Sequence, residues 1–342
     1  MTNNINISQI EQIIKPLQAK QHFTINTENE KQIRKWRNEI ANIINGKDNR
    51  LLLIVGPCSI HDYDVAINYA KELKKLSDLY SDKLMIVMRV YFEKPRSTIG
   101  WRGLINDPML DDSCHINDGI LLARQILLEI TNIGLPVGCE FLDVFLPQYY
   151  SDLISWGAIG ARTTESQQHR QLASGLSMPI GFKNGTGGSI DMAADALICA
   201  SYHHTFLGIN NQGIASRIKT KGNKNVHIIL RGSKNKPNYY PDDVNKACEI
   251  LKKKNLQPKI MIDMSHGNSQ KNYKNQELVC NSICDQIENK SIIGCMIESN
   301  INEGNQKISK NLKYGVSITD ACINLETTEH FFIKLSNALS KR

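Results

Sequence analysis

The sequence predicts an α/β protein built as one (β/α)8 barrel. Eight short runs rich in Ile, Val, Leu and Met follow one another from residue 51 onward, and each is nearly continuous in hydrophobicity. Parallel strands that helices cover on both faces have this character. Segments of helical periodicity separate most of the runs, whereas a doubly wound sheet more often has fewer strands and a glycine-rich dinucleotide turn. A TIM barrel in one domain therefore fits the 342 residues best.

The elements follow in a regular order. Strands are expected at residues 51–55, 84–90, 136–141, 157–161, 178–182, 226–230, 259–263 and 291–297. Helices are expected at residues 62–79, 117–133, 166–174, 190–200, 241–253, 275–287 and 319–339. A ninth apolar run, residues 204–209, is joined to the sixth strand by a loop without helical periodicity. This run predicts a hairpin insertion near the sixth βα unit.

The N-terminal segment differs from the rest of the chain. It is polar and rich in Asn, Gln, Lys and Glu, and only residues 28–44 have the pattern of an amphipathic helix. Nothing before that helix has the character of a strand or of a core. We expect an N-terminal arm and helix over residues 1–48, and the barrel over residues 49–342.

Composition excludes several classes of protein. No run approaches the roughly 18 apolar residues of a membrane span, and the N-terminus lacks the pattern of a secretory signal, so we expect a cytoplasmic protein. The nine cysteines, scattered from Cys58 to Cys322 without regular spacing, indicate reduced thiols. The net charge of +7 suits nucleic acid, a membrane surface or anionic small molecules, and composition does not choose among them.

A chemically active side chain follows every expected strand. In a barrel of this kind, catalytic groups lie at the carboxyl ends of the strands. The residues at those ends are Cys58, Arg89, Glu140, Arg162, Lys183, Arg231, His266 and Glu298. Chance placement would not put a cation, a carboxylate, a thiol or an imidazole at all eight positions.

The first chemical set consists of cations. If the barrel forms, one mouth gathers Arg89, Lys94, Arg96, Arg162, Lys183 and Arg231. Their mutual repulsion is tolerable only where polyanions bind, and planar guanidinium groups suit the oxygens of phosphates and carboxylates. Taken singly, each of these residues is more simply explained as a surface cation in an ordinary ion pair. Taken together, they predict phosphorylated substrates.

The second set consists of metal-ligating groups. Cys58, His266, Glu298 and Asp320, the last placed where the final helix is expected to open, offer sulfur, nitrogen and oxygen donors. Such a set suits Mn²⁺, Fe²⁺, Co²⁺ or Zn²⁺ without selecting among them. From the residues alone, it is equally possible that Cys58 is a buried apolar residue and His266 an ordinary loop histidine.

Three further motifs point to chemistry less directly. The run GTGGS at residues 185–189 has neither a Walker lysine nor dinucleotide spacing, so it predicts a tight turn rather than a phosphate loop. Of the adjacent His203 and His204, at most one can face a site. Cys280 and Cys284, four residues apart on an expected helix, are better explained by core packing than by metal binding.

A series of blocks resembles one enzyme family. GPCSI, RVYFEKPR, CEFLD, GAIGARTTESQ, LASGLSMPIGFKNGT, HIILRG, MIDMSHGNS, ESNINEGNQ and YGVSITDAC occur in that order between about Leu51 and Thr328. They closely resemble the bacterial and fungal type I 3-deoxy-D-arabino-heptulosonate-7-phosphate (DAHP) synthases. The resemblance implies a transferase, a 3-deoxy-7-phosphoheptulonate synthase, that condenses phosphoenolpyruvate with erythrose 4-phosphate and water at the entry to the shikimate pathway of aromatic amino acid biosynthesis.

The resemblance also assigns residues. The divalent metal ligands fall on Cys58, His266, Glu298 and Asp320. The phosphoenolpyruvate contacts fall on Arg89, Lys94, Arg162, Lys183 and Arg231, and the erythrose 4-phosphate contacts on Lys94, Pro95, Arg96 and Ser97. Cys58, His266 and Lys94 are the expected catalytic residues, with Lys94 as the proton donor, and Glu140 or His204 is expected to steer the attacking water.

The family pattern extends to regulation and assembly. Its members are homodimers or homotetramers inhibited by an aromatic amino acid, with the N-terminal arm helping to build the interface, so residues 1–48 are expected to serve assembly or regulation. Gly208 favours tyrosine as the effector, because phenylalanine-sensitive members tend to carry serine there. The chain departs from the pattern at Ser97, Gly187, Ser233 and Asn300, which affects fine tuning of affinity and loop geometry more than activity.

Two rival functions remain at this point. 3-Deoxy-D-manno-octulosonate-8-phosphate synthase shares the fold and phosphoenolpyruvate chemistry but extends arabinose 5-phosphate; Cys58 and the Lys-Pro-Arg-Ser run favour the four-carbon sugar. A barrel that binds nucleic acid or another polyanion without turnover would need no metal and would show steep salt dependence. The grouping of cations with a thiol, an imidazole and carboxylates favours the enzyme, with no nucleic-acid or membrane partner expected.

Overall fold

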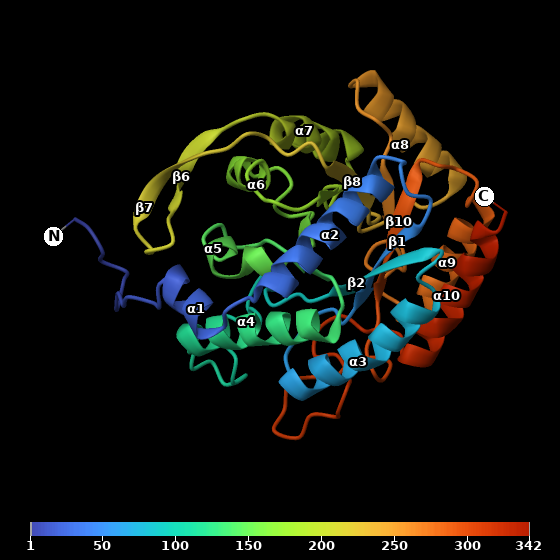
Figure 1. Ribbon diagram of the computed structural model, residues 1–342. Helices are drawn as coiled ribbons and strands as arrows, with labels where there is room; N and C mark the ends of the chain where they lie inside the picture. Colours follow the sequence, from blue (N-terminus) through green and yellow to red (C-terminus); the bar gives the residue numbers. More distant parts are fainter. Residues whose placement is uncertain (1, 342) are drawn as a thin grey trace.

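The computed structural model describes residues 2–341 and forms a closed barrel of eight parallel strands (Figure 1). The strands run around the barrel in the order β1-β10-β9-β8-β5-β4-β3-β2, and every neighbouring pair is parallel. They are β1 (Leu51–Gly56), β2 (Leu84–Arg89), β3 (Val137–Glu140), β4 (Trp156–Ile159), β5 (Ile180–Lys183), β8 (Val226–Leu230), β9 (Ile260–Asp263) and β10 (Ile292–Glu298). The predicted (β/α)8 fold is confirmed, with a strand at every expected run.

Helices cover the outside of the barrel (Figure 1). Those after the strands are α3 (Tyr63–Leu79), α4 (Ile116–Ile133), α6 (Gln167–Ala173), α7 (Ile190–Ser201), α8 (Pro241–Lys253), α9 (Gln276–Asp285) and α10 (Leu325–Leu339). Three short elements, α5 (Pro147–Tyr150), η1 (Ser151–Leu153) and η2 (Tyr273–Asn275), were not predicted, because so few residues carry no periodicity. No helix within residues 2–341 combines the length and apolarity needed to span a membrane.

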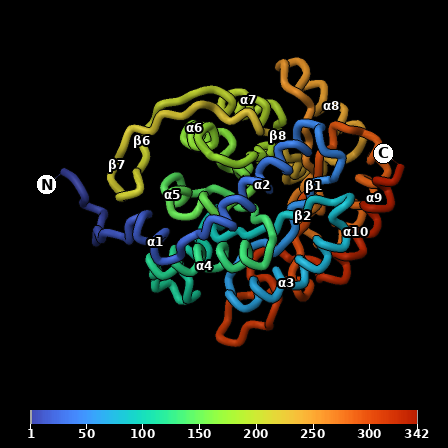
Figure 2. Tube along the Cα trace, in the orientation of Figure 1, coloured from blue at the N-terminus to red at the C-terminus, as the bar shows by residue number. Residues whose placement is uncertain are grey.

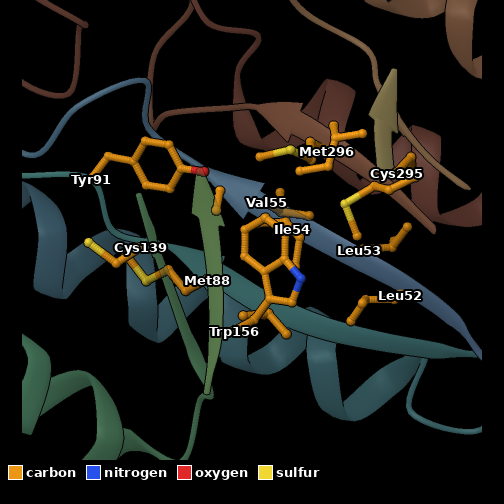
Figure 3. Close-up of a cluster of buried hydrophobic side chains, with 14 of the residues drawn as sticks. Leu52, Leu53, Ile54, Val55, Met88, Tyr91, Cys139, Trp156, Cys295 and Met296 are labelled. Atoms are coloured by element: carbon orange, nitrogen blue, oxygen red, sulfur yellow. The ribbon is translucent and has the colours of Figure 1, made fainter. Parts of the chain in front are cut away.

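The strands are buried on both faces, as their continuous hydrophobicity predicts. Every residue of β1, β2 and β10 is buried, and so are the residues of the other barrel strands. Figure 3 shows Trp156 among side chains that come from β1 and β10. The Trp156 indole donates a hydrogen bond to His227 Nε2 (3.3 Å), which satisfies its one polar atom. The barrel interior is therefore a packed core, and ligands have access only at the rims.

The N-terminal segment closes one rim. Helix α2 (Thr27–Ile44) packs Ile33, Trp36 and Ile40 inward. Arg37 of this helix donates to the carbonyls of Ser151 and Ile154, which lie in the segment that leads into β4. The amino ends of the strands are thus covered by α2, which crosses the barrel in Figure 1. Helix α2 does not cover the opposite rim, which the carboxyl ends of the strands form.

An additional helix lies in the N-terminal arm. Helix α1 (Pro16–His22) buries Pro16 and Ala19. The expectation that nothing before residue 28 has core character is therefore wrong, because one buried turn needs too few apolar residues to produce a periodic signal. Residues before α1 are mostly exposed.

The predicted hairpin insertion is confirmed. Strands β6 (Thr205–Ile209) and β7 (Ala215–Lys219) pair antiparallel between α7 and the sixth barrel strand, β8. Figure 2 shows the hairpin reaching away from the barrel toward the N-terminal segment. At its tip, the carbonyl of Asn211 accepts a hydrogen bond from the Leu17 amide of α1 (2.8 Å).

Candidate active site

A cavity of about 320 Å³ opens at the carboxyl ends of the strands. All six cations that the strand-end pattern predicted line it: Arg89, Lys94, Arg96, Arg162, Lys183 and Arg231. Lys271, from the loop after β9, adds a seventh positive charge that the sequence reasoning missed. The convergence of these residues is electrostatically unfavourable unless anions occupy the cavity.

Arg89 is the most deeply buried of these cations, with 1% of its surface exposed. Its guanidinium stacks on the Tyr91 ring at 3.6 Å and donates from Nη2 to Glu298 Oε1 (3.0 Å). Nε and Nη2 also donate to the carbonyls of Pro57 and Cys58. Nη1 is buried with no hydrogen-bond partner among residues 2–341. One donor of a rigidly held guanidinium is thus left for a ligand.

Lys94, one of the six cations, contacts Cys58, one of the four predicted metal ligands. Its ammonium donates to Cys58 Sγ (3.0 Å) and to the Cys58 carbonyl (3.1 Å). Burial by itself lowers the pKa of Lys94, but the interaction with Cys58, which includes a hydrogen bond, and the negative charge of Glu298 outweigh this effect, so the pKa is raised. The amine is therefore protonated and holds a proton at the mouth of the site.

The loop after β2 is fixed by hydrogen bonds at several points. The Lys94 amide donates to the Arg102 carbonyl (2.9 Å), and Arg96 Nε donates to the Trp101 carbonyl (2.8 Å). From across the cavity, Arg162 Nη2 donates to Ser97 Oγ (3.1 Å). The Lys-Pro-Arg-Ser run therefore forms one wall of the cavity, with the terminal nitrogens of Arg96 not engaged by its Trp101 bond.

Three of the four predicted metal ligands meet beside the cavity. One ligand atom from each of Cys58, Glu298 and Asp320 lies within 4.8 Å of the others. His266 Nε2 approaches the same group and lies 3.7 Å from Glu298 Oε1. A thiol, an imidazole and two carboxylates are the donor types that divalent first-row metals take. The residues present therefore fit a divalent ion.

The pKa values of Glu298 and Cys58, two members of this cluster, are shifted from their usual values. Burial alone would raise the pKa of Glu298, but His266 and Arg89 lower it to about 2, so Glu298 is ionised. Burial, reinforced by the negative charge of Glu298, raises the pKa of the Cys58 thiol. A thiol binds a metal ion as the thiolate, so metal binding at Cys58 would release the thiol proton.

Asp320 reaches the cluster from a loop, and the predicted start of the last helix is wrong. The helix was expected from residue 319, but α10 begins at Leu325, where Asn324 caps it by accepting from the Thr327 amide. The residues before the cap pair instead with the segment after β10, including a bridge between Gly304 and Cys322. This tertiary pairing replaces the local helical tendency.

Two carboxyl groups, those of Glu140 and Glu93, interact electrostatically at this end of the barrel. Glu140 lines the cavity, and Gly160 permits this position because a Cβ there would come within 2.3 Å of Glu140 Oε1. Glu93 is buried outside the cavity lining, and burial together with the neighbouring Asp143 raises its pKa to about 8. Glu93 is therefore mostly neutral at pH 7, which leaves Glu140 free of a second full negative charge beside it.

His204 lies away from the cavity, so its expected role in steering water is not supported. Helix α7 returns the chain toward the amino ends of the strands before residue 204, whereas the cavity opens at their carboxyl ends. The His204 ring contacts the Cys199 carbonyl at 2.8 Å instead. Glu140 is the remaining candidate. GTGGS forms the turn before α7, as expected, and ends in Ser189, which caps the helix.

The departures from the family pattern fit their surroundings. Ser97 keeps a hydroxyl that accepts a hydrogen bond from Arg162. A Cβ at Gly187 would meet nothing within 4 Å, so this position does not depend on glycine for space. Asn300 is buried and uses Oδ1 to accept from the Ile301 amide. Ser233 Oγ donates to the Lys236 carbonyl within its own loop. None of these four residues blocks the cavity.

Sequence reasoning missed Asp263, the last residue of β9. Its carboxylate is 1% exposed and lies 3.0 Å from Lys183 Nζ. An acidic residue that closes an otherwise apolar strand is the signal in the sequence that could have indicated it.

Comparison with known proteins identifies relatives along almost the entire chain. The family model described as "DAHP synthetase I family" matches residues 20–332, so it includes most of the N-terminal segment as well as the barrel. A Tyr-sensitive phospho-2-dehydro-3-deoxyheptonate aldolase of Escherichia coli is 51% identical over 96% of this chain and 93% of its own length. A tyrosine-inhibited aldolase of the same name from Schizosaccharomyces pombe is 51% identical over 95% of this chain and 89% of its own.

A solved structure agrees with this result. The phospho-2-dehydro-3-deoxyheptonate aldolase of Francisella tularensis superposes with a TM-score of 0.96 at 48% identity, and the match covers 98% of this chain and 99% of that one. The expected family resemblance is therefore confirmed in sequence and in fold. The chain belongs to the DAHP synthetase I family, the type I 3-deoxy-D-arabino-heptulosonate-7-phosphate synthases.

Proposed function

We propose that the rim cavity binds phosphoenolpyruvate and erythrose 4-phosphate side by side and condenses them. Membership of the family makes the protein a 3-deoxy-7-phosphoheptulonate synthase, a transferase of aromatic amino acid biosynthesis. The observation that carries the assignment of residues is the cavity itself, in which all six predicted cations lie beside a cluster of sulfur and oxygen ligands.

Phosphoenolpyruvate takes the deeper part of the cavity in this proposal. Arg89 and Lys183 are both buried there, and the unpartnered Nη1 of Arg89 supplies a donor that a carboxylate or phosphate oxygen would satisfy. Arg162 and Arg231 complete the set from the ends of neighbouring strands β4 and β8 on either side of β5. Guanidinium and ammonium groups are the donors that the oxygens of a phosphate and a carboxylate take.

Erythrose 4-phosphate takes the outer wall formed by Lys94, Pro95, Arg96 and Ser97, all of which line the cavity. Arg96 retains its terminal nitrogens for the sugar phosphate, since only Nε is engaged by Trp101. Lys94 lies between this wall and the buried cations, so its ammonium reaches toward both substrates.

Cys58, His266, Glu298 and Asp320 are the proposed ligands of a divalent metal ion. Bound there, Mn²⁺, Fe²⁺, Co²⁺ or Zn²⁺ would supply Lewis-acid polarisation of the aldehyde oxygen of erythrose 4-phosphate. Which of these ions serves in the cell is not fixed by the donor set.

The protein side chains then guide a balanced reaction. C3 of phosphoenolpyruvate forms a bond to the aldehyde carbon, and Lys94 gives its proton to the resulting alkoxide. Water adds to the electron-deficient C2 and passes a proton toward Glu140, which lines the cavity. The hemiketal phosphate loses inorganic phosphate by C–O cleavage, and the cations stabilise the departing charge. The products are DAHP and phosphate.

Phosphate release tests this function directly. With phosphoenolpyruvate as the donor, we expect release only with erythrose 4-phosphate, loss of that release after EDTA, and recovery on adding Mn²⁺. Release with arabinose 5-phosphate instead would establish the octulosonate synthase. No release with either sugar, together with steeply salt-dependent binding of DNA or RNA, would establish a polyanion-binding barrel.

We further propose tyrosine as the feedback inhibitor, which would bind away from the active site. A second cavity of about 210 Å³ lies between the hairpin and the segment around α5, lined in part by Pro147, Leu172, Phe206, Gly208 and Ile218. A Cβ at Gly208 would approach Ile218 Cγ1 within 2.8 Å, so glycine keeps this wall open. The extra room suits tyrosine, which is one hydroxyl larger than phenylalanine.

Inhibition assays test the effector. Tyrosine should inhibit the condensation at lower concentration than phenylalanine. Gly208→Ser should raise the half-inhibiting tyrosine concentration about ten-fold, equivalent to about 1.4 kcal/mol, by crowding the cavity. The uninhibited rate serves as the control, because Gly208 lies outside the active site. Inhibition by phenylalanine but not by tyrosine would contradict the assignment.

A homodimer or homotetramer is proposed for assembly, with the N-terminal arm at the interface. The support is the exposure of three isoleucines in that arm: Ile5 is 75% exposed, Ile7 51% and Ile10 76%. Several apolar side chains so close together in water are typical of a segment that packs against a partner.

A further inference from the structure

Asp263 occupies a central position in the rim that the proposed reaction does not use. It ends β9, and its Oδ2 lies 3.0 Å from Lys183 Nζ and 2.9 Å from His266 Nδ1. Its other oxygen, Oδ1, accepts from the Ser265 amide (3.0 Å). Lys183 ends β5, and β8 separates β5 from β9 in the barrel. One carboxylate thus contacts both Lys183, a proposed substrate-binding residue, and His266, a proposed metal ligand.

The contacts of Asp263 are not duplicated elsewhere. Among the described residues, Asp263 is the one acidic partner of Lys183, whose ammonium is almost fully buried. His266 Nδ1 likewise has no other hydrogen-bond partner within residues 2–341. Asp263 is itself only 1% exposed, so water does not take its place beside either neighbour. Removing it would leave both neighbours unpaired.

The backbone around Asp263 is also fixed. Its carbonyl accepts from Asn268 Nδ2 (2.8 Å), which ties the end of β9 to the turn that follows. In that turn His266 adopts a left-handed conformation with φ of 55°, which residues other than glycine rarely adopt. A carboxylate beside Nδ1 favours the imidazole tautomer that carries its proton there, and this leaves the Nε2 lone pair for a metal.

We propose that Asp263 is a positioning residue that orients His266 toward the metal and Lys183 toward phosphoenolpyruvate. This inference rests on the metal site proposed above. Asp263 acts through its neighbours, since Asp263 itself does not line the cavity. It makes metal affinity and phosphoenolpyruvate binding depend on a single carboxylate.

Direct metal binding tests the proposal without turnover. The paramagnetic resonance signal of free Mn²⁺ gives the dissociation constant of Mn²⁺ in the absence of substrates. For Asp263→Asn, nearly the same size but uncharged, we expect this constant to rise about 10- to 100-fold, as is typical when a carboxylate behind a ligating histidine is lost. At saturating Mn²⁺, the KM for phosphoenolpyruvate should rise while that for erythrose 4-phosphate stays the same.

Asp152→Asn is the matched control. Asp152 pairs with the buried Arg124 (2.8 Å) near the amino ends of the strands, so this variant also removes a carboxylate from a buried cation. Its Mn²⁺ constant and both KM values should equal those of the parent protein. Circular dichroism and thermal unfolding report whether each variant folds, and Asp263→Ser, which leaves space rather than a new donor, replaces Asp263→Asn if the latter does not.

Each outcome has one meaning. A parent protein that does not bind Mn²⁺ overturns the proposed metal site and this inference together. Parent-like Mn²⁺ affinity in the folded Asp263 variant overturns the inference alone, and so does an equal loss in Asp152→Asn. An unchanged or lower KM for phosphoenolpyruvate overturns the part that concerns Lys183. Weaker Mn²⁺ binding confined to Asp263, with a higher KM for phosphoenolpyruvate, supports it.

Discussion

Cys58→Ala is expected to lower kcat by at least about a thousand-fold, because Lewis-acid stabilisation of the aldehyde oxygen contributes several kcal/mol to the barrier. Cys58 is completely buried at the end of β1, and its sulfur is one of three ligand atoms within 4.8 Å of one another. Alanine removes the sulfur and leaves two carboxylates and an imidazole, so the ion loses one of its four proposed protein ligands. Phosphate release and Mn²⁺ affinity should fall together.

Cys280→Ala provides the comparison for this change. Cys280 is also completely buried, but it lies on α9 on the outside of the barrel. The same deletion there changes core packing without touching the rim, so kcat and Mn²⁺ affinity should stay at parent values. A Cys58→Ala protein that kept metal-dependent turnover near the parent rate would show that the thiol is a buried apolar residue rather than a ligand.

Lys94→Met should have the next largest effect, with kcat reduced about 10²- to 10⁴-fold, the usual contribution of a general acid. Methionine keeps an unbranched side chain of similar length but cannot donate a proton. The parent ammonium is 3.0 Å from Cys58 Sγ and faces both proposed substrate positions. Steady-state kinetics of phosphate release, with each substrate varied in turn, measures the loss.

Lys94→Arg separates charge from proton donation. Arginine keeps the positive charge but does not give up its proton, so the KM values should return toward the parent while kcat stays low. If Lys94→Arg restores kcat, the residue acts by charge alone. If Lys94→Met retains near-normal turnover while Cys58→Ala has none, the metal matters and the assigned role of Lys94 is wrong.

The barrel and the cations could be predicted because both depend on local information. A strand that is buried on both faces is apolar along its whole length, as residues 51–55 are. The carboxyl end of each such run lies at the rim where catalytic groups are found. Once that rule is applied, Arg89 and Lys183 must lie at the same rim of a closed barrel, and both line the cavity there. Helix α1 could not be predicted in this way, since it contributes only a single buried turn.

The relations between rim residues could not be predicted in the same way. Asp263 contacts Lys183 across the width of β8, a distance that no spacing along the chain encodes. Asp320 was placed on a helix because its neighbourhood has helical tendency, yet pairing with the segment after β10 overrides that tendency. His204 was expected near the site, although α7 had already carried the chain to the other end of the barrel.

By itself, the sequence determined the fold class, the rim at which chemistry occurs and the kinds of charge gathered there, because hydrophobic periodicity and residue type are properties of short segments. The tertiary structure alone decided which carboxylate faces which cation, that Lys94 touches the Cys58 sulfur, and that Asp263 supports two partners. Such contacts form only when the barrel closes, since closure brings residues from strands far apart in the chain to one edge.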